Sequence, residues 1–135
     1  MAAAMIFGCS SSKSSSALSG KEVVFEYNAY TLGSSVNYVV TKDLKKQKEV
    51  LQGEVTNYKN PVDADEWDDL LIATEKMDLE KIASIEVPST NYQSDAAMAA
   101  TLKITIDGKT YQSPTFDHDN PPAAIKEIIN DIIIL

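Results

Sequence analysis

The residues best suited to chemistry lie near the C-terminus, in the run Asp117-His118-Asp119. Carboxylates beside an imidazole can bind a divalent cation, or can orient the histidine for proton transfer in a cation-dependent hydrolase. In an extended segment the two aspartates would point to one side and His118 to the other, so one site using all three is awkward. The alternative is a capping loop before Pro121-Pro122, with His118 hydrogen-bonded locally. Since His118 is the only histidine, a His-rich zinc site is excluded.

A second cluster of carboxylates runs from Asp63 to Asp69 and superficially suggests calcium. An EF-hand loop needs an oxygen ligand at its fifth position and Gly at its sixth. Counted from Asp63, these positions hold Trp67 and Asp68, so the match fails. Acidic residues in the first turn of a helix, where they favour the positive end of the dipole, explain the cluster better. The sequence predicts no cofactor and no catalytic residue, and the favoured interpretation is that the chain is not an enzyme.

The single cysteine, Cys9, lies in the run Ile6-Phe7-Gly8-Cys9-Ser10 and is followed by a serine tract. One cysteine cannot form an internal disulfide. An apolar residue, a small residue and then Cys resembles the lipobox of bacterial lipoproteins. In that family the chain is cut before the Cys, which becomes a diacylglycerol-bearing N-terminus. The resemblance implies lipidation of Cys9. A reactive thiol and an incidental cysteine are the alternatives.

These features predict two parts. Residues 1–19 are expected to be a partial signal with the lipobox, followed by a Ser-rich tether that behaves as flexible coil. Residues 20–135 are expected to form a single domain. The predicted location is the cell envelope, as an outer-membrane lipoprotein facing the periplasm or the exterior.

Composition limits the partners. The 135 residues carry a net charge of −8, which argues against nucleic acid, where clustered basic residues must neutralise phosphates. No apolar run reaches the roughly 18 residues of a membrane-spanning helix. Tyr30, Tyr58 and Tyr92 fall in predicted loops and could line a recognition surface.

Alternating apolar and polar residues predict strands over 21–28, 36–41 and 49–55, with Asp43–Lys48 as a charged turn and Gly53 as a bulge. The pair Asp107-Gly108 predicts a tight hairpin between strands at 99–106 and 109–113. Counting from that turn sets Ile104 opposite Tyr111.

Two helices complete the pattern. Asp63 is the expected N-cap of the first, whose apolar stripe begins at Trp67. The second carries isoleucines from Ile125 onward, with Asn120 or Asp119 as its expected cap. The order βββ-α-ββ-α predicts the α+β class, an antiparallel sheet of about five strands with helices on one face.

The C-terminal half is similar to small lipoproteins of Bacteroidetes-type bacteria that have no assigned function. The similarity rests on Trp67 through Leu79, Pro88-Ser89-Thr90, the Asp107-Gly108 hairpin and, most specifically, Phe116-Asp117-His118-Asp119-Asn120-Pro121-Pro122. It implies envelope location and a lipid anchor, and no catalytic residues. The expected function is a binding module for an envelope protein or glycan, attached to the membrane through its lipid. A structural envelope protein without a specific ligand is the alternative, and a hydrolase using His118 is a weaker one.

Overall fold

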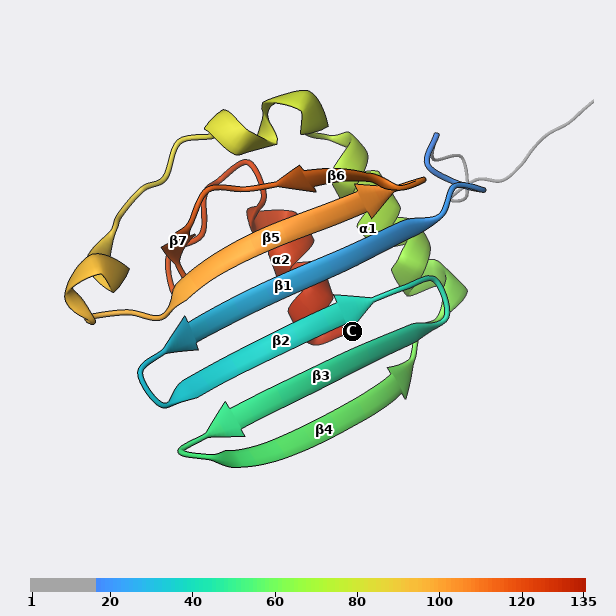
Figure 1. Cartoon of the computed structure of the whole chain (residues 1–135). Coiled ribbons are helices and arrows are strands. Elements are labelled where there is room, and N and C mark those ends of the chain that lie inside the picture. Colours follow the sequence, from blue (N-terminus) through green and yellow to red (C-terminus); the bar gives the residue numbers. More distant parts are fainter. Residues whose placement is uncertain (1–16) are drawn as a thin grey trace, which may run out of the picture.

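The structure is a computed structural model that describes residues 17–135, so Cys9 and most of the serine tract lie outside the described residues. Figure 1 shows a twisted sheet with two helices behind it. The elements in chain order are β1 (Val23–Thr31), β2 (Ser34–Val40), β3 (Leu44–Leu51), β4 (Glu54–Pro61), α1 (Ala64–Glu75), the short 3₁₀ helices η1 (Leu79–Ser84) and η2 (Asn91–Ser94), β5 (Ala99–Ile106), β6 (Lys109–Gln112), β7 (Phe116–Asp117) and α2 (Lys126–Ile134).

All strand pairs are antiparallel, in the order β4-β3-β2-β1-β5-β6, and β7 pairs with β5. The predicted α+β class is confirmed, with seven strands rather than about five. The first four strands form a meander, and β5 returns to the free edge of β1 after α1 and the two 3₁₀ helices. The centre of the sheet is therefore β1, whose alternating Val23, Phe25, Tyr27 and Ala29 are all buried.

One face of the sheet is covered and the other is open. Both helices lie behind the sheet in Figure 1, and α1 and α2 contact each other there. Trp67 of α1 packs its ring edge-on against Phe25, with centroids 5.7 Å apart. Ile128, Ile129 and Ile132 of α2 are buried on the same side. Because successive strand residues alternate between faces, the other half of each strand meets solvent.

The prediction for the third strand was wrong. The segment expected to be a charged turn, Asp43–Lys48, lies mostly in β3, and the hairpin turn is at Gln52-Gly53. Gln52 has φ of 51° and Gly53 of 90°, the two positive values of a tight two-residue turn. The strand β4, which was not predicted, follows. The strand accommodates its lysines on both faces: Lys46 and Lys48 are exposed on the open face, whereas Lys45 is buried on the covered face.

The hairpin at Asp107-Gly108 is confirmed, and Ile104 lies opposite Tyr111 as predicted. The expected cap of the last helix was wrong: α2 begins at Lys126 with Ile125 at its N-cap, whereas Asn120 lies in a preceding turn. Asn120 instead donates from its side-chain amide to Ser89 Oγ at 3.0 Å. The proline pair separates this turn from the helix.

Candidate functional site

The open face of the sheet carries ordered rows of polar side chains. Directly paired residues of neighbouring antiparallel strands point to the same face, so the register defines each row. One row crosses the strands as Lys59, Lys46, Val39, Glu26 and Lys103, and the next as Asn57, Lys48, Asn37, Asn28 and Thr101. The first row is thus mainly charged and the second mainly amide.

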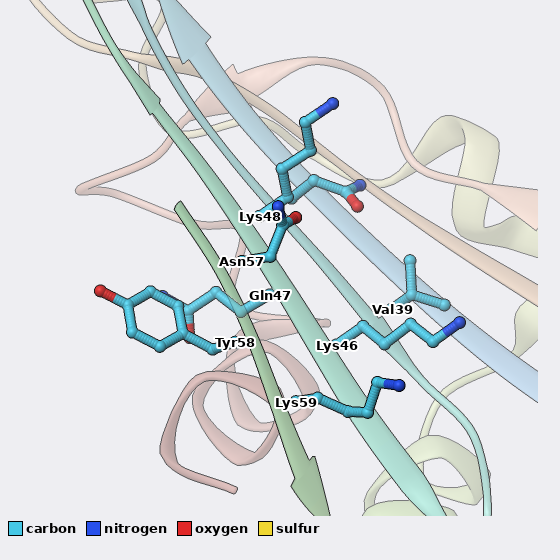
Figure 2. Close-up of a pocket in the computed structure, with 8 residues that line it drawn as sticks. Val39, Lys46, Gln47, Lys48, Asn57, Tyr58 and Lys59 are labelled. Atoms are coloured by element: carbon cyan, nitrogen blue, oxygen red, sulfur yellow. The ribbon is translucent and has the colours of Figure 1, made fainter. Parts of the chain in front are cut away.

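Residues of these rows on β2, β3 and β4, together with Gln47 and Tyr58, line an open hollow of about 490 Å³. In Figure 2, Lys46, Lys48 and Lys59 extend from one side of the strands, whereas Tyr58 extends to the other. We call this surface, made of Lys46, Lys48, Lys59, Asn37, Val39 and Asn57, the lysine face. Its three lysines and Asn57 are exposed, and Asn37 and Val39 are half-buried.

The lysine face is positive within an acidic protein. Lys103, in the same row, is neutralised by Glu26 at 3.1 Å. Lys46, Lys48 and Lys59 make no ion pair with any residue between 17 and 135. The acidic residues gather elsewhere: α1 and its cap carry Asp63, Asp65, Glu66, Asp68, Asp69 and Glu75, on the covered side of the sheet. Since nearby opposite charges are few, the three ammonium groups produce a local positive field.

The three side chains of the Asp117-His118-Asp119 run have separate surroundings and do not form the shared site that the sequence suggested. Asp117 is buried, and its carboxylate accepts hydrogen bonds from the Ser89 hydroxyl, from Asn91 N–H at 2.9 Å and from Tyr92 N–H at 2.7 Å. Burial tends to raise the pKa of Asp117, but these three donors outweigh it and hold the pKa below its usual value. Both carboxylate oxygens are thus engaged in fastening the Ser89–Tyr92 loop to β7.

His118 points to another partner. Its Nδ1 lies 2.8 Å from the hydroxyl of Tyr27 and its ring lies against the Tyr27 ring, with centroids 5.7 Å apart. Burial raises the pKa of Tyr27, and Tyr38 adds to the effect. Asp119 is exposed. The three side chains are therefore not brought to one point, and residues 17–135 contain no group of three potential metal ligands.

The acidic cluster and the three tyrosines singled out in the sequence lie on regular elements of the fold. Asp65 and Glu66 lie in the first turn of α1, and Glu66 accepts a hydrogen bond from Asp63 N–H at 3.2 Å, as a capping box requires. Tyr30 and Tyr58 are exposed on strands rather than on loops, and Tyr92 lies in η2. No helix within residues 17–135 is long and apolar enough to cross a bilayer.

The lysine face was missed from the sequence because its residues come from three strands, one of which was not predicted. The sequence feature that could have indicated the lysine face is the spacing of Lys46 and Lys48. They are two residues apart, which places both on one side of a strand. Gln52-Gly53 would have supplied the turn that brings Lys59 beside Lys46.

Comparisons of the chain with protein-family models, with curated proteins and with solved structures each find no match.

Proposed function

We propose that this chain is a binding module, held at the cell envelope by a lipid on Cys9, and that its lysine face receives an anionic partner. The observation that supports this most directly is the set of three exposed lysines with no ion pair among residues 17–135, in a chain of net charge −8. A surface selected only for solubility has no need to concentrate uncompensated positive charge on one face.

The place where the chain enters the sheet supports the proposed attachment through Cys9. The chain enters β1 at Val23, and the β1–β2 and β3–β4 hairpin turns lie at the opposite end of the strands, as Figure 1 shows. A tether at the Val23 end leaves the lysine face accessible from the side. The open hollow there has room for a ligand without rearrangement of the core.

We do not propose a hydrolase. Both oxygens of Asp117 are engaged by Ser89, Asn91 and Tyr92, and His118 pairs with Tyr27 rather than with a carboxylate. A general base must lie within hydrogen-bond reach of the proton that it removes, and His118 Nδ1 is already paired with the Tyr27 hydroxyl. These contacts support a structural role for the Asp117-His118 run.

The binding proposal is tested with dextran sulfate as a generic polyanion and the whole 135-residue chain. We expect binding at low ionic strength that weakens as salt is added, because exposed charges are screened. The variant K46Q/K48Q/K59Q should lose about tenfold or more in affinity, since each lost contact between exposed charges is worth up to about 1 kcal/mol. The control K42Q/K81Q/K126Q removes the same number of exposed lysines elsewhere.

Equal affinity of the two triple variants would overturn the proposal, because it would mean that net charge rather than the lysine face governs binding. Absence of binding by the unmodified chain would overturn it as well. The lipid anchor is tested separately, by mass spectrometry of the protein isolated from its native host. A diacylated N-terminal Cys9 is the expected result, and an intact chain beginning at Met1 would refute it.

A further inference from the structure

We infer that the anionic partner of the lysine face is an acidic polysaccharide, a polymer that carries both carboxylates and free hydroxyls. This inference rests on the proposed function, and it concerns what chemistry the face selects among anions. Three properties of the face support it: the kind of cation it offers, the spacing of those cations, and the amides that lie between them.

The kind of cation favours a ligand with many charges. All twelve basic residues of the chain are lysines. An exposed lysine is a hydrated point charge that cannot grip a carboxylate or phosphate in two places as arginine does. Each contact at a surface is therefore worth at most about 1 kcal/mol. Useful affinity then needs several contacts made by one molecule, which a repeating polymer supplies through its high effective concentration.

The spacing of the cations also favours, over a single small anion, a ligand whose charges are spread out. Lys46 and Lys48 lie two residues apart along β3, which places their Cα atoms roughly 7 Å apart. Lys59 lies directly opposite Lys46 on β4, about 5 Å away across the strand pair. The three charges are thus spread over two strands on an open surface, and they do not converge on one point. Such an arrangement suits charges distributed along a chain.

The amides point to hydroxyls as well as charges. A lysine can only donate hydrogen bonds, and an ionised carboxylate can only accept them. Asn57 and Asn37 also offer carbonyl oxygens, which need a donor from the ligand. The amide NH₂ of Asn37 donates to Asn28 Oδ1, so the Asn37 oxygen remains as an acceptor on this face. Sugar hydroxyls donate and accept, whereas simple anions leave these oxygens unused.

Val39 completes the floor of the hollow between Lys46 and Glu26 in the same row. An apolar side chain at this place can contact the C–H face of a sugar ring, while the lysines and amides around it reach the substituents. An acidic polypeptide would use the lysines in the same way but has no regular set of hydroxyls for Asn37 and Asn57. The two ligand classes are therefore separable by experiment.

The test compares three polymers of matched length, using the whole chain and isothermal titration calorimetry. Polygalacturonate carries carboxylates and hydroxyls, poly-L-glutamate carries carboxylates and backbone amides but no hydroxyls, and dextran carries hydroxyls alone. We expect polygalacturonate to bind about tenfold more tightly than poly-L-glutamate and dextran not to bind measurably. Asn57→Val should weaken binding of polygalacturonate several-fold and that of poly-L-glutamate much less, because the side chains of poly-L-glutamate offer no donor to the Asn57 oxygen. Asn57 is exposed on an edge strand, so valine, a good strand former, keeps the fold.

The possible outcomes separate the two proposals. If polygalacturonate and poly-L-glutamate bind equally, or if Asn57→Val weakens both equally, the polysaccharide inference is wrong while the anion-binding function stands. If neither polymer nor dextran sulfate binds, the proposed function fails with it. If poly-L-glutamate binds more tightly than polygalacturonate, the partner is an acidic protein segment instead.

Discussion

The buried hydroxyl of Tyr27 gives a prediction that can be followed over pH. Tyr27 is fully buried at the centre of the sheet, between Tyr38 and Phe116, and its hydroxyl is bonded to His118 Nδ1 at 2.8 Å. We consider the change Tyr27→Phe, which keeps the ring and removes the oxygen. At neutral pH the variant loses one hydrogen bond, and we expect its free energy of unfolding to be lower by roughly 1 kcal/mol.

Above pH 10 this difference in stability shrinks, and it disappears or reverses by about pH 11. The pKa of Tyr27 is raised in the folded state, whereas an unfolded tyrosine ionises near pH 10. Above that pH the unfolded chain holds fewer protons than the folded chain, so stability falls as pH rises, by about 1.4 kcal/mol per pH unit for one group. This loss integrates to about 1.4 kcal/mol at pH 11. The variant lacks this loss, so its stability should equal or exceed that of the unmodified protein there.

The assay is urea unfolding at fixed temperature from pH 7 to pH 11, followed by the fluorescence of Trp67. Trp67 is the only tryptophan and is buried against Phe25, so its emission reports the packing of α1 on the sheet. Tyr38 is present in both proteins, so the rise of its own pKa on burial affects both. The control is Tyr30→Phe, which removes an exposed hydroxyl. A difference between Tyr27→Phe and the unmodified protein that stays constant up to pH 11 would refute the reasoning.

Three further changes test other contacts. Lys45 is buried and donates from Nζ to Ile133 O at 2.8 Å and to Leu135 O at 3.0 Å. Lys45→Met should therefore lower the free energy of unfolding, measured by urea titration, by about 2–3 kcal/mol. An unchanged urea midpoint would contradict this. Asp117→Asn should lower the free energy of unfolding at neutral pH. Because the pKa of Asp117 is lowered in the folded state, the unmodified protein loses this advantage as the pH falls below the unfolded pKa of about 3.9, so the difference between the two proteins should shrink. Stability curves of the two proteins that stay parallel in acid would count against this. Gly53→Ala, at φ of 90°, should cost about 1 kcal/mol by thermal unfolding, and an unaltered transition would disprove the strain.

Much of the fold could be predicted because its signals are local. The Asp107-Gly108 hairpin needs two positive φ values, and the sequence offers residues suited to both, so strand pairing followed directly. The burial of Phe25 and Tyr27 follows from simple alternation. The turn at Gln52-Gly53 has the same geometry, but glutamine is not typical of its first position. Missing that turn removed β4 from the prediction.

The candidate sites depended on contacts that sequence spacing does not reveal. Asp117 was identified as a residue of interest, but its partner Ser89 is 28 positions away along the chain. Tyr27 and His118 are 91 positions apart. Whether a carboxylate binds a metal ion or fastens a loop depends on which donors the fold brings to it, and that is decided by tertiary packing. The lysine face likewise exists only once three strands are in register.

The full exposure of β4 has a consequence for how the protein fluctuates. Every residue of this edge strand is exposed, whereas β1 and β5 contribute most of the buried strand residues. Local opening costs least where few apolar contacts are lost, so amide hydrogens of the β3–β4 hairpin should exchange with solvent well before those of β1. A ligand on the lysine face would bridge β2, β3 and β4 and slow that exchange. Protection of these amides would then locate the ligand without any substitution.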